Sequence, residues 1–279
     1  TFRHALGIAE YFSARCPMMR VVQSPTMLRD AHGAGAFVGL NSLLMAKEGM
    51  TGAPAETVED SSVAVHWADI GKRWEIDSQY FKPWPVCRWA QPALTAMLAI
   101  QRENPGLNAD SIETIRVETF YESMCLQGHT PQNADEAQYA LAFPLAALIV
   151  REKLGPDEVT GASISSPDIL SLSSRIEIVE APDISARFPN EILSRLTITL
   201  KNGAVIVSPV TAAKGDPDTP MTVEELDQKF DLFSANLGRE RSLAVKQAIH
   251  TLDQSASAIA ALTPLFLGTE PSPIDRGNS

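Results

Sequence analysis

The feature of this sequence that most constrains its fold is a β-hairpin pattern in residues 191–211. Apolar residues alternate with polar ones over 196–200 and again over 205–207, on either side of Asn202-Gly203. An Asn-Gly pair between two alternating runs is a strong signal for a tight hairpin turn. The sequence therefore predicts antiparallel strands late in the middle of the chain.

Two further stretches are typical of strands, and helical patterns surround them. Residues 112–117 alternate in polarity, and residues 176–179 form a second, shorter strand pattern. Apolar spacing and helix-boundary residues predict helices at 1–15, before Gly49, at 92–103, at 137–154, from Thr222, and at about 240–262.

The order of these elements predicts an α+β protein. Residues 1–76 are expected to be the first part of a helical domain, and residues 77–213 an inserted α+β lid domain. Residues 214–279 are expected to return to the helical domain and to end in a mobile tail. On this interpretation the large all-helical domain is discontinuous in sequence, and a cleft between domains is a favoured place for a ligand.

Details of the helix ends can also be predicted. Asn133 or Asp135 can cap the helix that follows, and Pro144 should kink that helix or mark its real start. The same helix is expected to end at Gly155, and Thr222 with Glu225 has the spacing of a capping box.

Residues 80–99 are the most unusual stretch of the chain. Lys82 stands between an aromatic residue and Pro83, which biases it toward extended geometry, whereas Pro92 suits the first turn of a helix. We interpret the stretch as an extended strand that leads into a helix, with Lys82 and Cys87 near the junction. Charged groups on rigid loops beside a helix start often bind anions. A buried aromatic corner from which Lys82 reaches solvent explains the same pattern, and the sequence leaves both interpretations open.

A glycine-rich run, GAGAFVG, follows Arg29, Asp30 and His32. It resembles a dinucleotide fingerprint only superficially, because no strand precedes it and no βαβ unit follows. Glycines there would let a backbone or a ligand approach closely. Arg29 is a candidate anion ligand, although a surface ion pair with Asp30 is the alternative.

Composition excludes several classes of function. The net charge of −11 argues against nucleic acid and anionic membranes as partners. The three cysteines are widely spaced and include no CxxC, so neither a disulfide framework nor a zinc site is indicated, and a cytoplasmic setting is expected. The candidates for chemistry are Arg29, His32, Lys82, Cys87 and His129, although a cysteine such as Cys87 is more often a small buried side chain than a nucleophile.

Four stretches together carry a resemblance to a known family. They are PTMLRDAHGAGAFVGLNSLLMAKEGMTGAP, YFKPWPVCRWAQPALTA, AQYALAFPLAALI and KGDPDTPMTVEELDQKF. In order and spacing they resemble the MmgE/PrpD family, which includes 2-methylcitrate dehydratases, cis-aconitate decarboxylases and iminodisuccinate epimerases. The chain resembles the C-terminal three-fifths of a member, and the family's N-terminal helices, which carry an aspartate and histidines of the active site, are expected to precede it.

The resemblance assigns roles to single residues. Lys82 matches the family's active-site lysine, and it is expected to be catalytic and to bind substrate. Arg29 falls where many members have a lysine; it keeps the charge but cannot transfer a proton. Phe143 falls where a catalytic tyrosine is often found, and Gln91 where a histidine is frequent. His32 is the second expected catalytic residue, and Arg29, Cys87 and Phe143 are expected to line the substrate site.

The resemblance also implies an activity. It implies a lyase, either a dehydratase or a decarboxylase, that acts on a small di- or tricarboxylate without metal or organic cofactor. It further implies a homodimer, with no nucleic-acid or membrane partner. An isomerase or epimerase of the same family, or a non-catalytic remnant that keeps dimerisation and anion binding, is the alternative.

Overall fold

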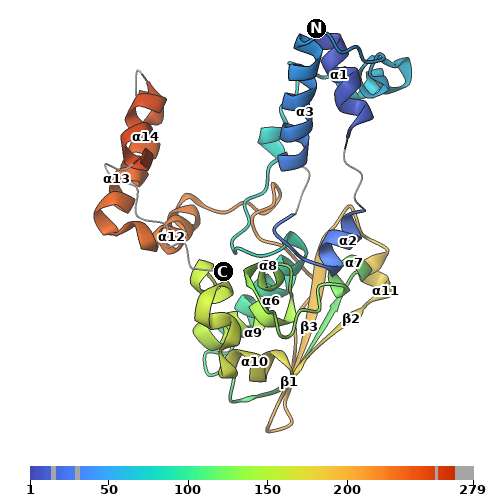
Figure 1. Ribbon diagram of the computed structural model, residues 1–279. Helices are drawn as coiled ribbons and strands as arrows, with labels where there is room; N and C mark the ends of the chain where they lie inside the picture. The colour runs from blue at the N-terminus through green and yellow to red at the C-terminus, as the bar shows by residue number, and fades with distance from the viewer. Residues whose placement is uncertain (14–16, 29–31, 255–256, 268–279) are drawn as a thin grey trace. The chain divides into compact units, whose positions relative to one another are not determined.

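The computed structural model describes residues 1–13, 17–28, 32–254 and 257–267 (Figure 1). The chain divides into two compact units, Thr1–Pro220 and Met221–Ser279. Both helices and strands are present, as an α+β protein requires, and the described strands all lie in the first unit. The discontinuous helical domain with an inserted lid stays a prediction.

Within the described residues, five strands form one mixed sheet in the order β2-β1-β3-β4, with β5 paired to β3. Strand β1 runs parallel to β2 and antiparallel to β3, and β4 and β5 both run antiparallel to β3. Their bounds are β1 Ile112–Thr119, β2 Ile176–Glu180, β3 Leu193–Leu200, β4 Val205–Val207 and β5 Thr211–Ala212.

The hairpin predicted from Asn202-Gly203 is confirmed. Strands β3 and β4 pair through Ile198 and Ile206, and Gly203 has the positive φ of 85° that this turn needs. The strand at Ile112 is confirmed too, with a register shift between Ile112 and Thr114. That irregularity places Ile112 and Ile115, three positions apart, in the same buried layer.

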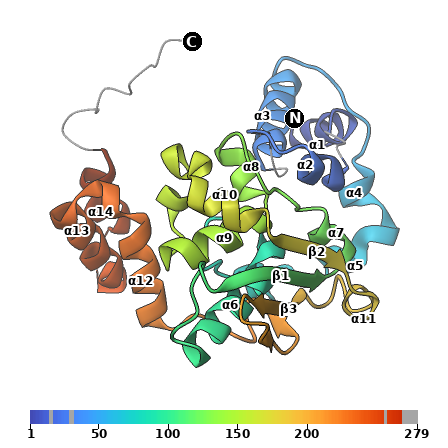
Figure 2. The same ribbon diagram turned by 90° about the horizontal axis from the view of Figure 1, so that it is seen from below.

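Two helices cover one face of the sheet and enclose the main core. Helix α6 (Gln91–Glu103) contacts β3, helix α9 (Ala142–Arg151) contacts β2, and the two helices contact each other (Figure 2). Helix α10 (Pro167–Ser173) packs against α9. The opposite face carries charged cross-strand pairs, which join Arg116 to Glu177 and Arg195 to Glu118.

Shorter helices connect these elements. They are α2 (Met18–Gln23), which places Val22 in the main core, α7 (Tyr121–Met124), α8 (Ala134–Gln138) and α11 (Pro182–Ser185). Asn133 is a helix cap, as predicted, and accepts from the amide of Glu136 at the start of α8. The single helix predicted over 137–154 is wrong, because α8 ends at Gln138 and α9 begins at Ala142. Helix α9 begins two residues before Pro144, so this proline marks the start of the helix.

The N-terminal helices form a small cluster of their own. Helix α1 (Phe2–Tyr11) packs against α3 (His32–Lys47), and their contact buries Ala5, Ile8 and Ala46. Short helices α4 (Glu56–Glu59) and α5 (Ala64–Trp67) follow. The helix predicted to stop at Gly49 is confirmed, and Gly49 has the expected positive φ.

The second unit contains α12 (Val223–Phe233), α13 (Arg239–His250) and α14 (Ala258–Leu267). Thr222 and Glu225 form the predicted capping box at the start of α12. The single helix predicted over about 240–262 is wrong, because α13 ends at His250 and a short 3-10 turn, Leu252–Gln254, follows. The predicted mobile tail falls largely outside the described residues.

Two further predictions need correction. Residues 80–87 form no strand, because Pro83 and Pro85 lack the N–H groups that a strand ladder uses. Helix α9 ends at Arg151 rather than Gly155, and Glu152 closes it with a left-handed conformation. None of the helices in the described ranges has both the length and the apolar character needed to cross a membrane.

Candidate active site

The segment that carries Lys82 is held in a fixed loop. The side chain of Gln91, at the start of α6, donates from Nε2 to the carbonyls of Trp84 and Val86 at 3.2 and 3.1 Å. The amide of Cys87 donates to the carbonyl of Gln138 at 2.7 Å, which ties the loop to the end of α8. The loop thus gets its shape from hydrogen bonds rather than from a strand ladder.

Lys82 itself is half-buried, and its ammonium group forms no hydrogen bond or ion pair with any residue that the structure describes. A cation on a rigid loop that lacks a protein partner is available to an anion from solution. The role of Lys82 as an anion ligand stays a prediction.

A second cation, Arg88, lies at the end of the same loop. Its Nη2 donates to Asp216 at 2.5 Å, and its guanidinium carbon lies 4.2 Å from the centre of the Tyr80 ring. The other two nitrogens, Nε and Nη1, are buried without a partner among the described residues. Arg88, Tyr80 and Asp216 contribute to the wall of a cavity of about 440 Å³.

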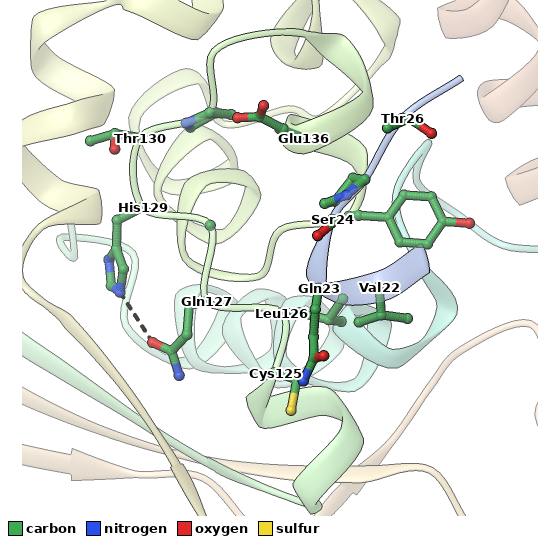
Figure 3. Close-up of a pocket in the computed structure, with 14 residues that line it drawn as sticks. Val22, Gln23, Ser24, Thr26, Cys125, Leu126, Gln127, His129, Thr130 and Glu136 are labelled. Carbon is green, nitrogen blue, oxygen red and sulfur yellow. Dashed lines mark hydrogen bonds between the residues drawn. The ribbon is translucent and has the colours of Figure 1, made fainter. Parts of the chain in front are cut away.

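A cavity of about 480 Å³ lies between the end of α2 and the loop that follows α7 (Figure 3). One wall is formed by Gln23, Ser24 and Thr26, and the other by Gln127 and His129, which lie side by side. The lining combines apolar side chains such as Val22 and Leu126 with polar ones that include both donors and acceptors. A mixed lining of this kind suits a small ligand that has both apolar and polar groups.

The hydrogen bonds of His129 indicate which of its ring nitrogens carries a proton. Nδ1 lies 2.8 Å from the carbonyl oxygen of Ser173, which can only accept, so Nδ1 carries a proton. Nε2 lies 3.3 Å from Oε1 of Gln127, whose amide is oriented by a 2.8 Å bond from its Nε2 to the Met124 carbonyl. The second contact is a hydrogen bond only when the imidazole carries both protons, and the neutral ring presents a lone pair to this oxygen.

The other predicted site residues lie on several different elements. Cys87 is half-buried on the same loop, and its backbone contacts α8. Phe143 is fully buried in the main core, and its amide donates to the carbonyl of Gly128 at 3.3 Å. His32 is exposed at the start of α3, and Arg29 lies outside the described residues. No hydrogen bond between side chains joins any two members of this set in the described ranges.

The glycine-rich run at the start of α3 is surrounded by open space in the described structure. Gly33, Gly35 and Gly39 lie inside α3, and a Cβ on any of them would meet nothing within 4 Å. No described backbone outside the helix packs against these three positions, and the close approach of a ligand there stays a prediction.

Sequence reasoning missed Arg88 and Asp216. The two are 128 positions apart, so no local pattern indicates that they form a pair. Arg88 is a charged residue in the otherwise apolar run VCRWA, and this was the one local signal that could have marked it. Among the described residues, no three His, Cys, Asp or Glu side chains gather as they do in a metal centre.

Comparison with known protein families decides the assignment of the chain. Residues 84–254 match the MmgE/PrpD C-terminal domain, which is more than half of the sequence. The chain belongs to the MmgE/PrpD family. The match begins at Trp84, two residues after Lys82, and it contains Cys87, Phe143 and the Arg88–Asp216 pair. A search of curated proteins gave no match.

Proposed function

We propose that this MmgE/PrpD protein is a lyase that dehydrates or decarboxylates a small di- or tricarboxylate such as 2-methylcitrate or cis-aconitate. The match of residues 84–254 to the family's C-terminal domain carries the proposal. The family reactions begin at a carbon next to a carboxylate, so a site for them must hold that carboxylate and move a proton nearby.

Lys82 is the residue that would hold the carboxylate. Its ammonium group has no partner in the described part of the chain, and the net charge of −11 makes a local cation necessary for an anionic substrate. A hydrogen bond to a charged group contributes about 1.5–3 kcal/mol. Arg29 would add a second cation, and Lys82 or His32 would transfer the proton.

A binding protein without catalytic activity is the second candidate. Phe143 stands where many members have a catalytic tyrosine, and its ring has no hydroxyl and no exposed surface. A protein of this kind would keep the carboxylate contact of Lys82 and lose turnover. Family isomerases and epimerases need no net loss of water or CO₂, so product analysis separates them from a lyase.

The test is calorimetric binding of citrate, 2-methylcitrate and cis-aconitate, together with detection of products. We expect Lys82→Ala to weaken binding by about tenfold or more, because it removes a charged hydrogen bond. Lys201→Ala, which removes an exposed lysine beside the hairpin turn, is the matched control and should leave the affinity unchanged. Equal affinities of Lys82→Ala and the unaltered protein would remove the basis of the proposal.

A further inference from the structure

The loop of residues 213–219, which contains the Gly-Asp-Pro-Asp part of the fourth family stretch, contacts the Lys82 segment at two places. The amide of Phe81 donates to the carbonyl of Gly215 at 2.9 Å, just before Lys82. After Lys82, Arg88 donates to Asp216 at 2.5 Å. Lys82 therefore lies between two contacts with neighbouring residues of one loop.

The contact at Gly215 requires glycine. Its φ is +99°, and a Cβ built on it would lie 2.0 Å from the carbonyl oxygen of Phe81. Because that oxygen belongs to the backbone, it cannot move aside as a flexible side chain would. The close approach of the two backbones thus depends on the absence of a side chain at position 215.

The 213–219 loop is itself fixed. The amide of Gly215 donates to Thr219 at 2.8 Å, and the amide of Thr219 donates back to Asp216 at 2.9 Å. The amide of Lys214 donates to the hydroxyl of Thr95 on α6 at 3.3 Å, which connects the loop to the core helix. A fixed loop can hold its neighbour in one place.

The Arg88–Asp216 pair is better suited to fixing the positions of two chain segments than to stabilising the fold. Both side chains are largely buried, at 19% and 23% exposure, and two guanidinium nitrogens have no described acceptor. Removing charges from water costs free energy that a single hydrogen bond offsets only in part. Such a pair adds little net stability, but it restricts where the two chain segments can lie.

We propose that Arg88, Gly215 and Asp216 are positioning residues, which hold the segment on both sides of Lys82 and so fix the place of its ammonium group. The effect on substrate affinity rests on the proposed function. If the Lys82 ammonium group is already fixed before a carboxylate binds, less conformational entropy is lost on binding and the affinity is higher.

The test measures Lys82 directly, in the full chain and without substrate. The protein is treated with a trace of an acetylating reagent, and the acetylation rate of Lys82 is compared with that of Lys201 by peptide mass spectrometry. In Asp216→Ala the rate at the half-buried Lys82 should rise by up to about tenfold, because loss of one hydrogen bond to a charged group shifts a local equilibrium by about that factor. In Gly215→Ala the rate should rise as well, because the added Cβ clashes with the Phe81 carbonyl and forces the two backbones apart. The rate at Lys201 should not change.

Two further variants test whether the effect depends on the charge at position 216 and on this ion pair in particular. Asp216→Glu keeps the charge and should return the rate at Lys82 toward that of the unaltered protein. Glu177→Gln removes the exposed ion pair with Arg116 and should leave Lys82 unaffected. Unaltered acetylation of Lys82 in folded Asp216→Ala and Gly215→Ala would overturn the proposal.

Citrate calorimetry on the same variants separates this proposal from the proposed function. A faster Lys82 reaction with about tenfold weaker citrate binding in Asp216→Ala supports both. A faster Lys82 reaction in a protein that binds no polycarboxylate supports the positioning role and contradicts the proposed function alone. Citrate binding that depends on Lys82, with no change of either readout in Asp216→Ala, contradicts the positioning role alone.

Discussion

Gln91 holds the carbonyl of Trp84 through a 3.2 Å hydrogen bond from its Nε2, across a separation of seven residues. The same nitrogen donates to Val86, and the side chain is only 1% exposed. Its Oε1 is buried without a partner among the described residues. The turn after Lys82 therefore depends on one amide group that lies at the start of α6.

Replacing Gln91 with leucine should destabilise the protein. Two carbonyls lose their donor, and each buried polar group left without a partner costs about 1–3 kcal/mol. Gln91→His, which introduces the residue frequent in the family, keeps one donor and should cost less. Urea denaturation checks both. Gln132→Leu, at an exposed glutamine, is the control, and equal stability of Gln91→Leu and this control would contradict the argument.

The cross-strand pair of Glu118 and Arg195 should make stability depend on pH. Arg195 on β3 donates to both carboxylate oxygens of Glu118 on β1 at 3.0 Å, and this hydrogen bond is the main cause that lowers the pKa of Glu118. A folded-state pKa below the unfolded one means that the stabilisation is complete above the unfolded pKa. It is lost as the pH falls through the folded pKa.

Glu118→Gln should therefore lower the free energy of unfolding by about 1 kcal/mol at neutral pH, as a partly exposed ion pair does. The difference should shrink once the pH falls below about 4, near the ordinary pKa of glutamate. Denaturation midpoints measured across this range check the prediction. Glu113→Gln, an exposed position on the same strand, should show no such trend. A constant difference at all pH values would contradict the role of ionised Glu118.

The apolar surface of α3 is expected to cause self-association. Phe37, Leu40 and Leu44 are 70%, 60% and 49% exposed in the described structure. Exposed apolar clusters of this kind commonly mark protein–protein contacts. Light scattering on the double variant Phe37→Ser, Leu40→Ser should show less association than on the unaltered protein. Val205→Thr, at an exposed valine of β4, is the control, and an unaltered oligomeric state in the double variant would contradict the prediction.

Much of the fold could be predicted because its signals are local. The Asn202-Gly203 turn, the Asn133 cap and the Thr222 capping box each depend on the chemistry of a few neighbouring residues, and all are confirmed. The strand predicted near residue 80 is wrong because one residue type has two effects. The prolines of residues 80–87 favour extended geometry, but their missing N–H groups prevent a strand ladder.

The candidate site was harder to predict, because its contacts join distant parts of the chain. The partner of Arg88 comes from a loop 128 residues later, and Gly215 contacts Phe81 from that same loop. Periodicity cannot indicate such pairs. Resemblance to the family drew attention to Lys82 and to the KGDPDTP stretch, but it did not indicate that these two segments touch.

Phe143 provides the sharpest test of how far family roles apply to this chain. Its ring is fully buried in the main core, among residues of α6, α9 and the sheet. Phe143→Tyr would restore the hydroxyl that many members have at this position. In this structure the new phenol oxygen would be buried with no hydrogen-bond partner among the described residues, and such burial costs about 1–3 kcal/mol. We therefore expect a lower denaturation midpoint, unchanged citrate affinity and no gain in turnover.

Phe120→Tyr, at an equally buried ring in a separate cluster, controls for the general cost of a buried hydroxyl. If Phe143→Tyr instead raised turnover without loss of stability, the hydroxyl would have to reach the substrate, and Phe143 would belong to the catalytic surface.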